Sequence, residues 1–189
     1  MTYTINEHLT NSSIAEDDIF MVFGIPNNKI DNLQLIGRWF KRNPETHFKY
    51  IRGSLRDTSS KLNLQLLKTL YPKVRFITAI DNPWCRIYHI HHVHPVFNKI
   101  SLKNFVKLIS SLPSYCVNLL DLYPPDKSII FLRNEYIETD FIKFSKSSNA
   151  VFTLPETINY RRLFDKESND LIRLIYQKDL SFFYPELLS

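Results

Sequence analysis

The segment from Phe76 to His92, FITAIDNPWCRIYHIHH, constrains the fold most, because one apolar run stops at Asp81 and a second resumes at helical spacing. Asn82 is a favourable N-cap, and Pro83 is a favourable first helical residue. The segment therefore predicts a buried strand that leads directly into a helix. The unpaired N–H groups of the first helical turn would form an anion site at the carboxyl end of that strand.

Arg86 lies one turn into this predicted helix. Because a helical side chain leans toward the N-terminus of its helix, the guanidinium could bind an anion at the same corner. It could equally serve as a structural group that clamps the turn. The sequence leaves both roles open.

Strand patterns and helix patterns alternate along the chain. Strands are expected over residues 19–23, 47–51, 73–80 and 128–132, and helices over residues 31–40, 61–70, 102–112, 135–146 and 166–177. This alternation predicts an α/β fold, a three-layer sandwich with a central, mainly parallel sheet flanked by helices. Ligands of such sheets bind beyond the carboxyl ends of the strands. In the last helix, Leu171, Leu174 and Ile175 are expected to face the core.

Length and composition predict one domain. A chain of 189 residues with 44% hydrophobic content can bury a sizeable core, and domains typically span about 50–250 residues. We expect a single domain over residues 1–189, with residues 1–17 as a flexible or peripheral segment and His8 exposed. The net charge of +5 favours anionic partners. Because the basic residues are dispersed, no dedicated nucleic-acid-binding arm is expected.

The N-terminal residues are polar and acidic, unlike a signal peptide, and no run approaches the roughly 20 apolar residues of a membrane span. These features predict a cytoplasmic or otherwise soluble protein without a transmembrane segment. Cys85 and Cys116 are the two cysteines, and their spacing does not suggest a disulfide scaffold.

Three segments, in order, resemble the sulfotransferases that use the donor PAPS, in the carbohydrate-type branch of that family. The NPWCR segment (residues 82–86) resembles the family's "VRNPWxRLVSAY" motif. Residues 128–146 are similar to its "R-x-E-x-L-xx-D-F" strand and helix, and residues 158–186 to its closing "N…L…Y-x-x-D-x-x-x-F" helix. Together they cover roughly the C-terminal two thirds of the chain. The resemblance implies a sulfotransferase fold, which is related to the P-loop NTPases.

The resemblance also implies a donor site. A Pro-Lys-x-Gly-x-Thr-Ser loop cradles the 5′-phosphosulfate in the family, whereas this chain has Pro26, Asn27 and Asn28, with Lys29 as the nearby cation. The family's Arg before Asn-Pro and a Ser within the helix hold the 3′-phosphate, and Asp81 and His89 occupy those positions here. The residues that the resemblance places near PAPS or its product PAP are Pro26, Asn27, Asn28, Lys29, Asn82, Arg86 and His89.

By the same resemblance, the activity is transfer of a sulfuryl group from PAPS to a hydroxyl of a carbohydrate or a similar acceptor. His47 begins an expected strand, as a catalytic His does in some uronic-acid-directed members, and is the candidate general base. One alternative is a catalytically inactive binding module that keeps the fold and has lost the nucleotide site.

A second alternative is a histidine-dependent metal protein. His89, His91, His92 and His94 lie within six residues. On a helix only pairs of them share a face, and a metal site would need a further ligand from elsewhere. We therefore expect no metal.

Overall fold

A computed structural model describes residues 4–12, 19–22, 61–146 and 158–188 of the chain. Its contacts divide the chain into two compact units. The first unit contains Tyr3–Ile80 and Pro125–Thr153, and the second contains Asp81–Pro124 and Leu154–Ser189. Whether both belong to one domain over residues 1–189 stays a prediction.

The first unit contains a three-stranded parallel sheet. Its strands are β1 (Ile19–Val22), β2 (Val74–Ile80) and β3 (Ile129–Arg133), in the order β1-β2-β3. Ile19 is paired with Val74, and Phe76 with Ile129. Every residue of β3 is buried, as in a parallel sheet that is covered on both faces. The predicted α/β class with a parallel sheet is confirmed.

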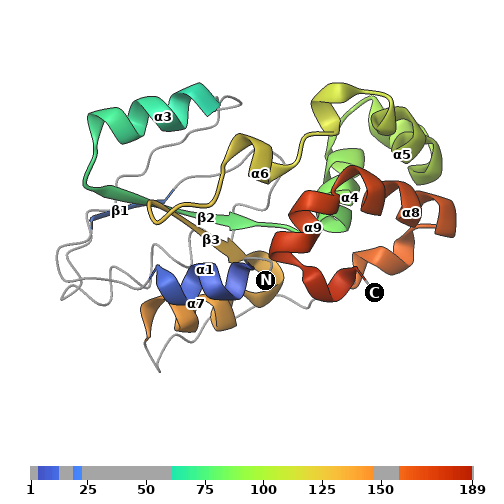
Figure 1. Ribbon diagram of the computed structural model, residues 1–189. Helices are drawn as coiled ribbons and strands as arrows, with labels where there is room; N and C mark the ends of the chain where they lie inside the picture. Colours follow the sequence, from blue (N-terminus) through green and yellow to red (C-terminus); the bar gives the residue numbers. More distant parts are fainter. Residues whose placement is uncertain (1–3, 13–18, 23–60, 147–157, 189) are drawn as a thin grey trace. The chain divides into compact units, whose positions relative to one another are not determined.

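Helices flank this sheet within the first unit. Figure 1 shows α3 (Lys61–Leu70) on one side of the sheet, and α7 (Ile137–Ser145) with α1 (Ile5–Asn11) on the other. The bounds of α3 match the prediction. The predicted helix over residues 135–146 begins instead with a 3-10 turn, η3 (Asn134–Tyr136), before α7.

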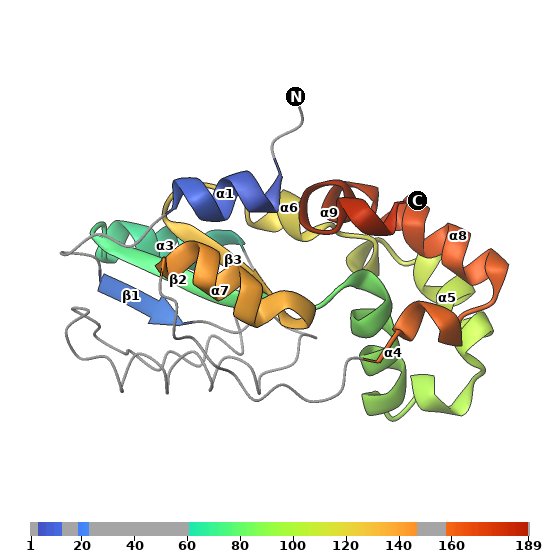
Figure 2. The same ribbon diagram turned by 90° about the horizontal axis from the view of Figure 1, so that it is seen from below.

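The N-terminal helix corrects two expectations. Ile5 and Leu9 of α1 are 0% exposed and His8 is 1% exposed. The prediction of a flexible or peripheral segment is therefore wrong for residues 5–11, and so is the prediction of an exposed His8. This short amphipathic helix packs against β3 and α7. In Figure 2, α1 lies along β3 on the side away from β2.

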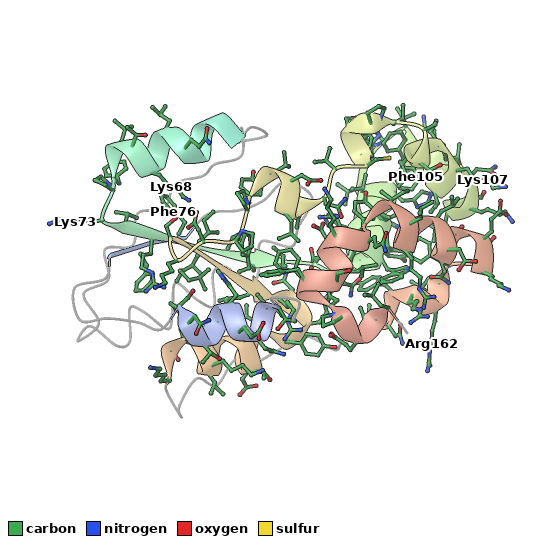
Figure 3. All side chains as sticks on the ribbon, viewed as in Figure 1. Lys68, Lys73, Phe76, Phe105, Lys107 and Arg162 are labelled. Atoms are coloured by element: carbon green, nitrogen blue, oxygen red, sulfur yellow. The ribbon has the colours of Figure 1, made fainter. Side chains whose placement is uncertain are left out.

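The second unit is helical. Its longer helices are α4 (Pro83–Val93), α5 (Leu102–Ser110), α8 (Lys166–Ile175) and α9 (Gln177–Phe183), and the shorter turns are η1 (Phe97–Lys99), η2 (Pro113–Tyr115), α6 (Leu119–Leu122), η4 (Tyr160–Leu163) and η5 (Pro185–Leu187). Phe105 of α5 is fully buried in this unit, whereas Lys107 of the same helix extends outward (Figure 3). No helix among the described residues has the length and apolar character needed to cross a membrane.

The face of α8 differs from the prediction. Ile172 is 0% exposed, whereas Leu174 is 71% exposed. Two apolar stripes overlap on this helix, and periodicity alone does not decide which one faces the core, because neighbouring residues are only about 100° apart. The helix predicted over residues 166–177 ends early, at Ile175, and Tyr176 separates it from a further helix, α9, that begins at Gln177.

Candidate functional site

The start of α4 has the predicted capping geometry. Asn82 has extended backbone angles, and its side-chain oxygen accepts a hydrogen bond from the Cys85 N–H at 2.9 Å. Pro83 is the first helical residue. The N-cap prediction is confirmed, and this cap already satisfies one of the N–H groups that an anion would otherwise bind.

Asp81 precedes α4, and His89 lies within it. Asp81 is 2% exposed, so its carboxyl group is not at the open surface. His89 is half-buried on α4. A carboxylate about 4 Å from a phosphate is repelled by about 1 kcal/mol even at the dielectric constant of water, and by more in a drier site. An ionised Asp81 would therefore oppose a phosphate bound beside it.

Arg86 is buried and contacts a carboxylate of the same unit. Its Nη2 lies 3.4 Å from Oδ2 of Asp179, and their side chains are 7% and 2% exposed. The guanidinium also lies over the ring of Tyr176, 4.6 Å from its centroid. Arg86 thus joins α4 to the start of α9, as the structural interpretation of this residue predicts. Its role as a donor ligand stays a prediction.

Asp179 is held mainly by backbone groups. Its two carboxylate oxygens accept hydrogen bonds from the N–H groups of Leu119, at 2.9 Å, and Leu120, at 3.1 Å, which begin α6. Burial raises the pKa of Asp179 above its ordinary value, although Arg86 and these two N–H groups act in the opposite direction. The carboxylate is therefore a costly charge that Arg86 partly compensates.

Two further residues complete what we call the Arg86 network, defined as Arg86, Asn118, Tyr176 and Asp179. Asn118 accepts a hydrogen bond from the Asp179 N–H at 3.1 Å and donates one to the carbonyl of Ile175, also at 3.1 Å. The Tyr176 hydroxyl donates to the carbonyl of Tyr115, and burial raises the pKa of Tyr176. The network connects α4, α6 and α9 within the second unit.

Trp84 has a structural role on the same helix. It is 1% exposed, and its Nε1–H donates to Oδ1 of Asn169 at 2.7 Å. The amide nitrogen of Asn169 donates to the carbonyl of Phe164 at 3.0 Å, and the Arg161 guanidinium lies 5.8 Å from the Trp84 ring centroid. These contacts fix α4 to η4 and α8.

The other histidines on and after α4 bind separate backbone groups. His91 donates through Nε2–H to the carbonyl of Ile100 at 2.8 Å, and His92 donates through Nδ1–H to that of Tyr88 at 2.9 Å. His94 accepts through Nδ1 from backbone N–H groups of the next turn. These contacts stabilise the end of α4, and the Nδ1 atoms of His91 and His92 also lie 3.3 Å apart.

The predicted site residues fall into two groups. Asn82, Arg86 and His89 lie on or beside the first turns of α4. The rest, Pro26, Asn27, Asn28, Lys29 and His47, lie outside the described residues, and their roles stay predictions. Sequence reasoning missed Asp179 as the partner of Arg86, and it missed Asn118 as a partner of Asp179. The Y-x-x-D spacing of Tyr176 and Asp179 was the available signal, because it predicts two polar groups on one helix face.

Comparison with known proteins gives a distant likeness. No family model matches the chain, and no curated protein matches it. Among solved structures, the crystal structure of mouse sulfotransferase SULT7A1 complexed with PAP is similar over 93% of this chain and 70% of that chain, with 14% sequence identity and a TM-score of 0.40. A likeness this distant assigns neither an activity nor a ligand to this chain, and it does not single out the carbohydrate-type branch.

Proposed function

We propose that the chain is a sulfotransferase-like protein that transfers a sulfuryl group from PAPS to a hydroxyl of a carbohydrate or a similar acceptor. The observation that carries this proposal is the contact between Arg86 and Asp179. These residues belong to two segments that resemble the family separately and are 93 positions apart in the sequence. Their contact supports a common fold as the origin of both matches, since two segments that matched the family by chance would not be expected to contact each other.

The remaining parts of the proposal rest on the resemblance. Lys29, with Pro26, Asn27 and Asn28, forms the donor loop, and His47 is the candidate general base for the acceptor hydroxyl. Bound PAPS supplies the activated sulfuryl group. The anionic donor agrees with the net charge of +5.

The described residues do not fit a 3′-phosphate in the way that the family binds it. Asp81 has the wrong sign of charge, and the positive charge of Arg86 is already shared with Asp179. The same two observations favour a second candidate function, a catalytically inactive sulfotransferase-fold binding module without a nucleotide site.

Calorimetric titration with PAP separates the two candidates. The informative variant is Asp81→Asn, which removes the opposing charge with little change in shape. If the start of α4 faces a nucleotide, the wild-type protein binds PAP, and Asp81→Asn binds it about fivefold more tightly. This factor corresponds to about 1 kcal/mol of relieved repulsion. Asp121→Asn on α6 is the matched control, since it makes the same change in net charge and should leave PAP affinity unchanged.

The inactive module predicts a different result. Neither the wild-type protein nor Asp81→Asn would then bind PAP at millimolar concentration, although both remain folded by circular dichroism. Equal tightening by Asp81→Asn and Asp121→Asn would indicate non-specific attraction of an anion, and the proposed nucleotide site would be rejected.

A further inference from the structure

A buried histidine connects α1 to the edge of the sheet. His8 is 1% exposed, and its Nε2 lies 2.8 Å from the carbonyl oxygen of Ile129, the first residue of β3. Because a carbonyl oxygen only accepts, Nε2 carries the proton in this bond. The ring of Phe131 lies 6.0 Å away, centroid to centroid, so the imidazole sits against apolar surface.

The carbonyl that His8 binds belongs to the outer side of β3. Along a parallel strand, successive residues direct their backbone groups alternately to the two neighbours. The Ser128 carbonyl accepts from Phe76 of β2, so that of Ile129 points away from β2. Within the described residues β3 ends the sheet on this side, and α1 lies along it (Figure 2). His8 thus satisfies a backbone acceptor on a strand edge.

Several charged groups surround this helix. Asp126, in the turn before β3, favours a protonated His8, and Arg75 of β2 disfavours it. Arg75 also donates to the Ser12 carbonyl just after α1, at 2.7 Å, and Lys143 of α7 donates to the Asn6 side chain at 2.7 Å. Burial has the largest effect and lowers the pKa of His8 below its ordinary value of 6.5. The site therefore favours the neutral ring.

We propose that α1 is a proton-sensitive cover for the edge of β3, in which neutral His8 holds the helix on the strand and protonation of His8 releases it. Release exposes the imidazolium of His8 to water. In the docked helix the same charge would stay on a side chain that is 1% exposed. Release leaves the outer backbone groups of β3 without this cover, and an uncovered strand edge is open to pairing with another strand.

Amide hydrogen exchange of residues 5–11 tests this cover, measured between pH 7 and pH 5 and corrected for the intrinsic exchange rate. In the wild-type protein the opening equilibrium of α1 should rise as the pH falls below 6.5, by up to about tenfold per pH unit for one bound proton. His8→Gln, whose amide can still donate to Ile129 but does not titrate, should show no such rise. His92→Gln, at an exposed histidine, is the matched control and should behave like wild type.

The wild-type protein alone can overturn the proposal. If corrected exchange in α1 does not change between pH 7 and pH 5, the helix is not released by protons. An equal rise in His8→Gln would assign the effect to another group. Should His8→Gln fail to fold, the imidazole signal of His8 in the wild-type NMR spectrum decides instead, and a ring that titrates at or above pH 6.5 contradicts the proposal.

Discussion

Each unit of the molecule contains a buried Arg–Asp pair, and the two pairs are built differently. In the first unit, Nε and Nη2 of Arg133 bind the two carboxylate oxygens of Asp140 at 2.8 and 2.7 Å, and Asp140 also accepts from the Arg133 N–H at 2.9 Å. In the second unit, Arg86 reaches Asp179 by a single contact of 3.4 Å. The stronger bonds of Asp179 go to the backbone of α6.

This difference separates a clamp from an adjustable contact. The bidentate geometry of Arg133 and Asp140 satisfies both charges, and these residues are seven positions apart, so the pair closes the turn between β3 and α7 locally. Arg86 is bound less tightly to Asp179 and lies over the Tyr176 ring. We infer that a bound anion could draw Arg86 away from Asp179 at a lower cost in free energy than it could draw Arg133 away from Asp140.

The largest expected effect is at the clamp. Asp140→Ala leaves the Arg133 guanidinium buried without its carboxylate, and we expect the free energy of unfolding to fall by about 3–5 kcal/mol. Urea denaturation followed by circular dichroism measures this change. Asp121→Ala is the control, because its partner Lys178 is exposed and surface pairs contribute at most about 1 kcal/mol. A loss at Asp140 no larger than the loss at Asp121 would contradict the clamp.

The pair in the second unit should couple more weakly. In double-mutant cycles we expect about 3 kcal/mol between Arg133 and Asp140 but less than about 1 kcal/mol between Arg86→Met and Asp179→Asn. Because the pKa of Asp179 is raised, its favourable contribution is present below the ordinary value of 3.8 and is lost as the pH rises through the higher folded value. Asp179→Asn should therefore remove this part of the decline in stability between acidic and neutral pH. Equal coupling energies for both pairs would end the distinction between them.

The sequence predicted what depends on neighbouring residues. The cap at Asn82, the bounds of α3 and the three described strands follow from local spacing and from short apolar runs. The Arg133–Asp140 contact was not predicted, although both residues lie within one motif. The partner of Arg86 could not be derived in this way, because no spacing rule relates residues that are 93 positions apart.

The remaining wrong predictions concern which side chains are buried. His8 looked like an exposed terminal residue, because its position against β3 depends on a strand that follows more than a hundred residues later. Leu174 looked like a core residue, because the stripe that includes it competes with the one that includes Ile172. The predicted donor loop at residues 26–29 and the candidate base His47 lie outside the described residues, so only the part of the candidate site at the start of α4 is described.

The smallest effect on stability is expected at a solvent-exposed ion pair, which we compare with the two buried Arg–Asp pairs. Asp165 caps α8 by accepting from the Ser168 N–H at 2.8 Å, and it also contacts Lys103 at 3.0 Å. The Ser168 bonds and Lys103 lower the pKa of Asp165 to about 2, so its contribution is present above pH 3.8 and is lost as the pH falls toward 2. Asp165→Asn keeps a capping oxygen without the charge, whereas Asp165→Ala removes both. We expect a lower Tm at pH 7 for both variants, with the smaller loss for Asp165→Asn, and a wild-type Tm that approaches that of Asp165→Asn as the pH falls toward 2. If Asp165→Asn lowered the Tm at pH 7 as much as Asp165→Ala does, the ion pair rather than the cap would stabilise α8, and exposure would not separate this pair from the buried ones.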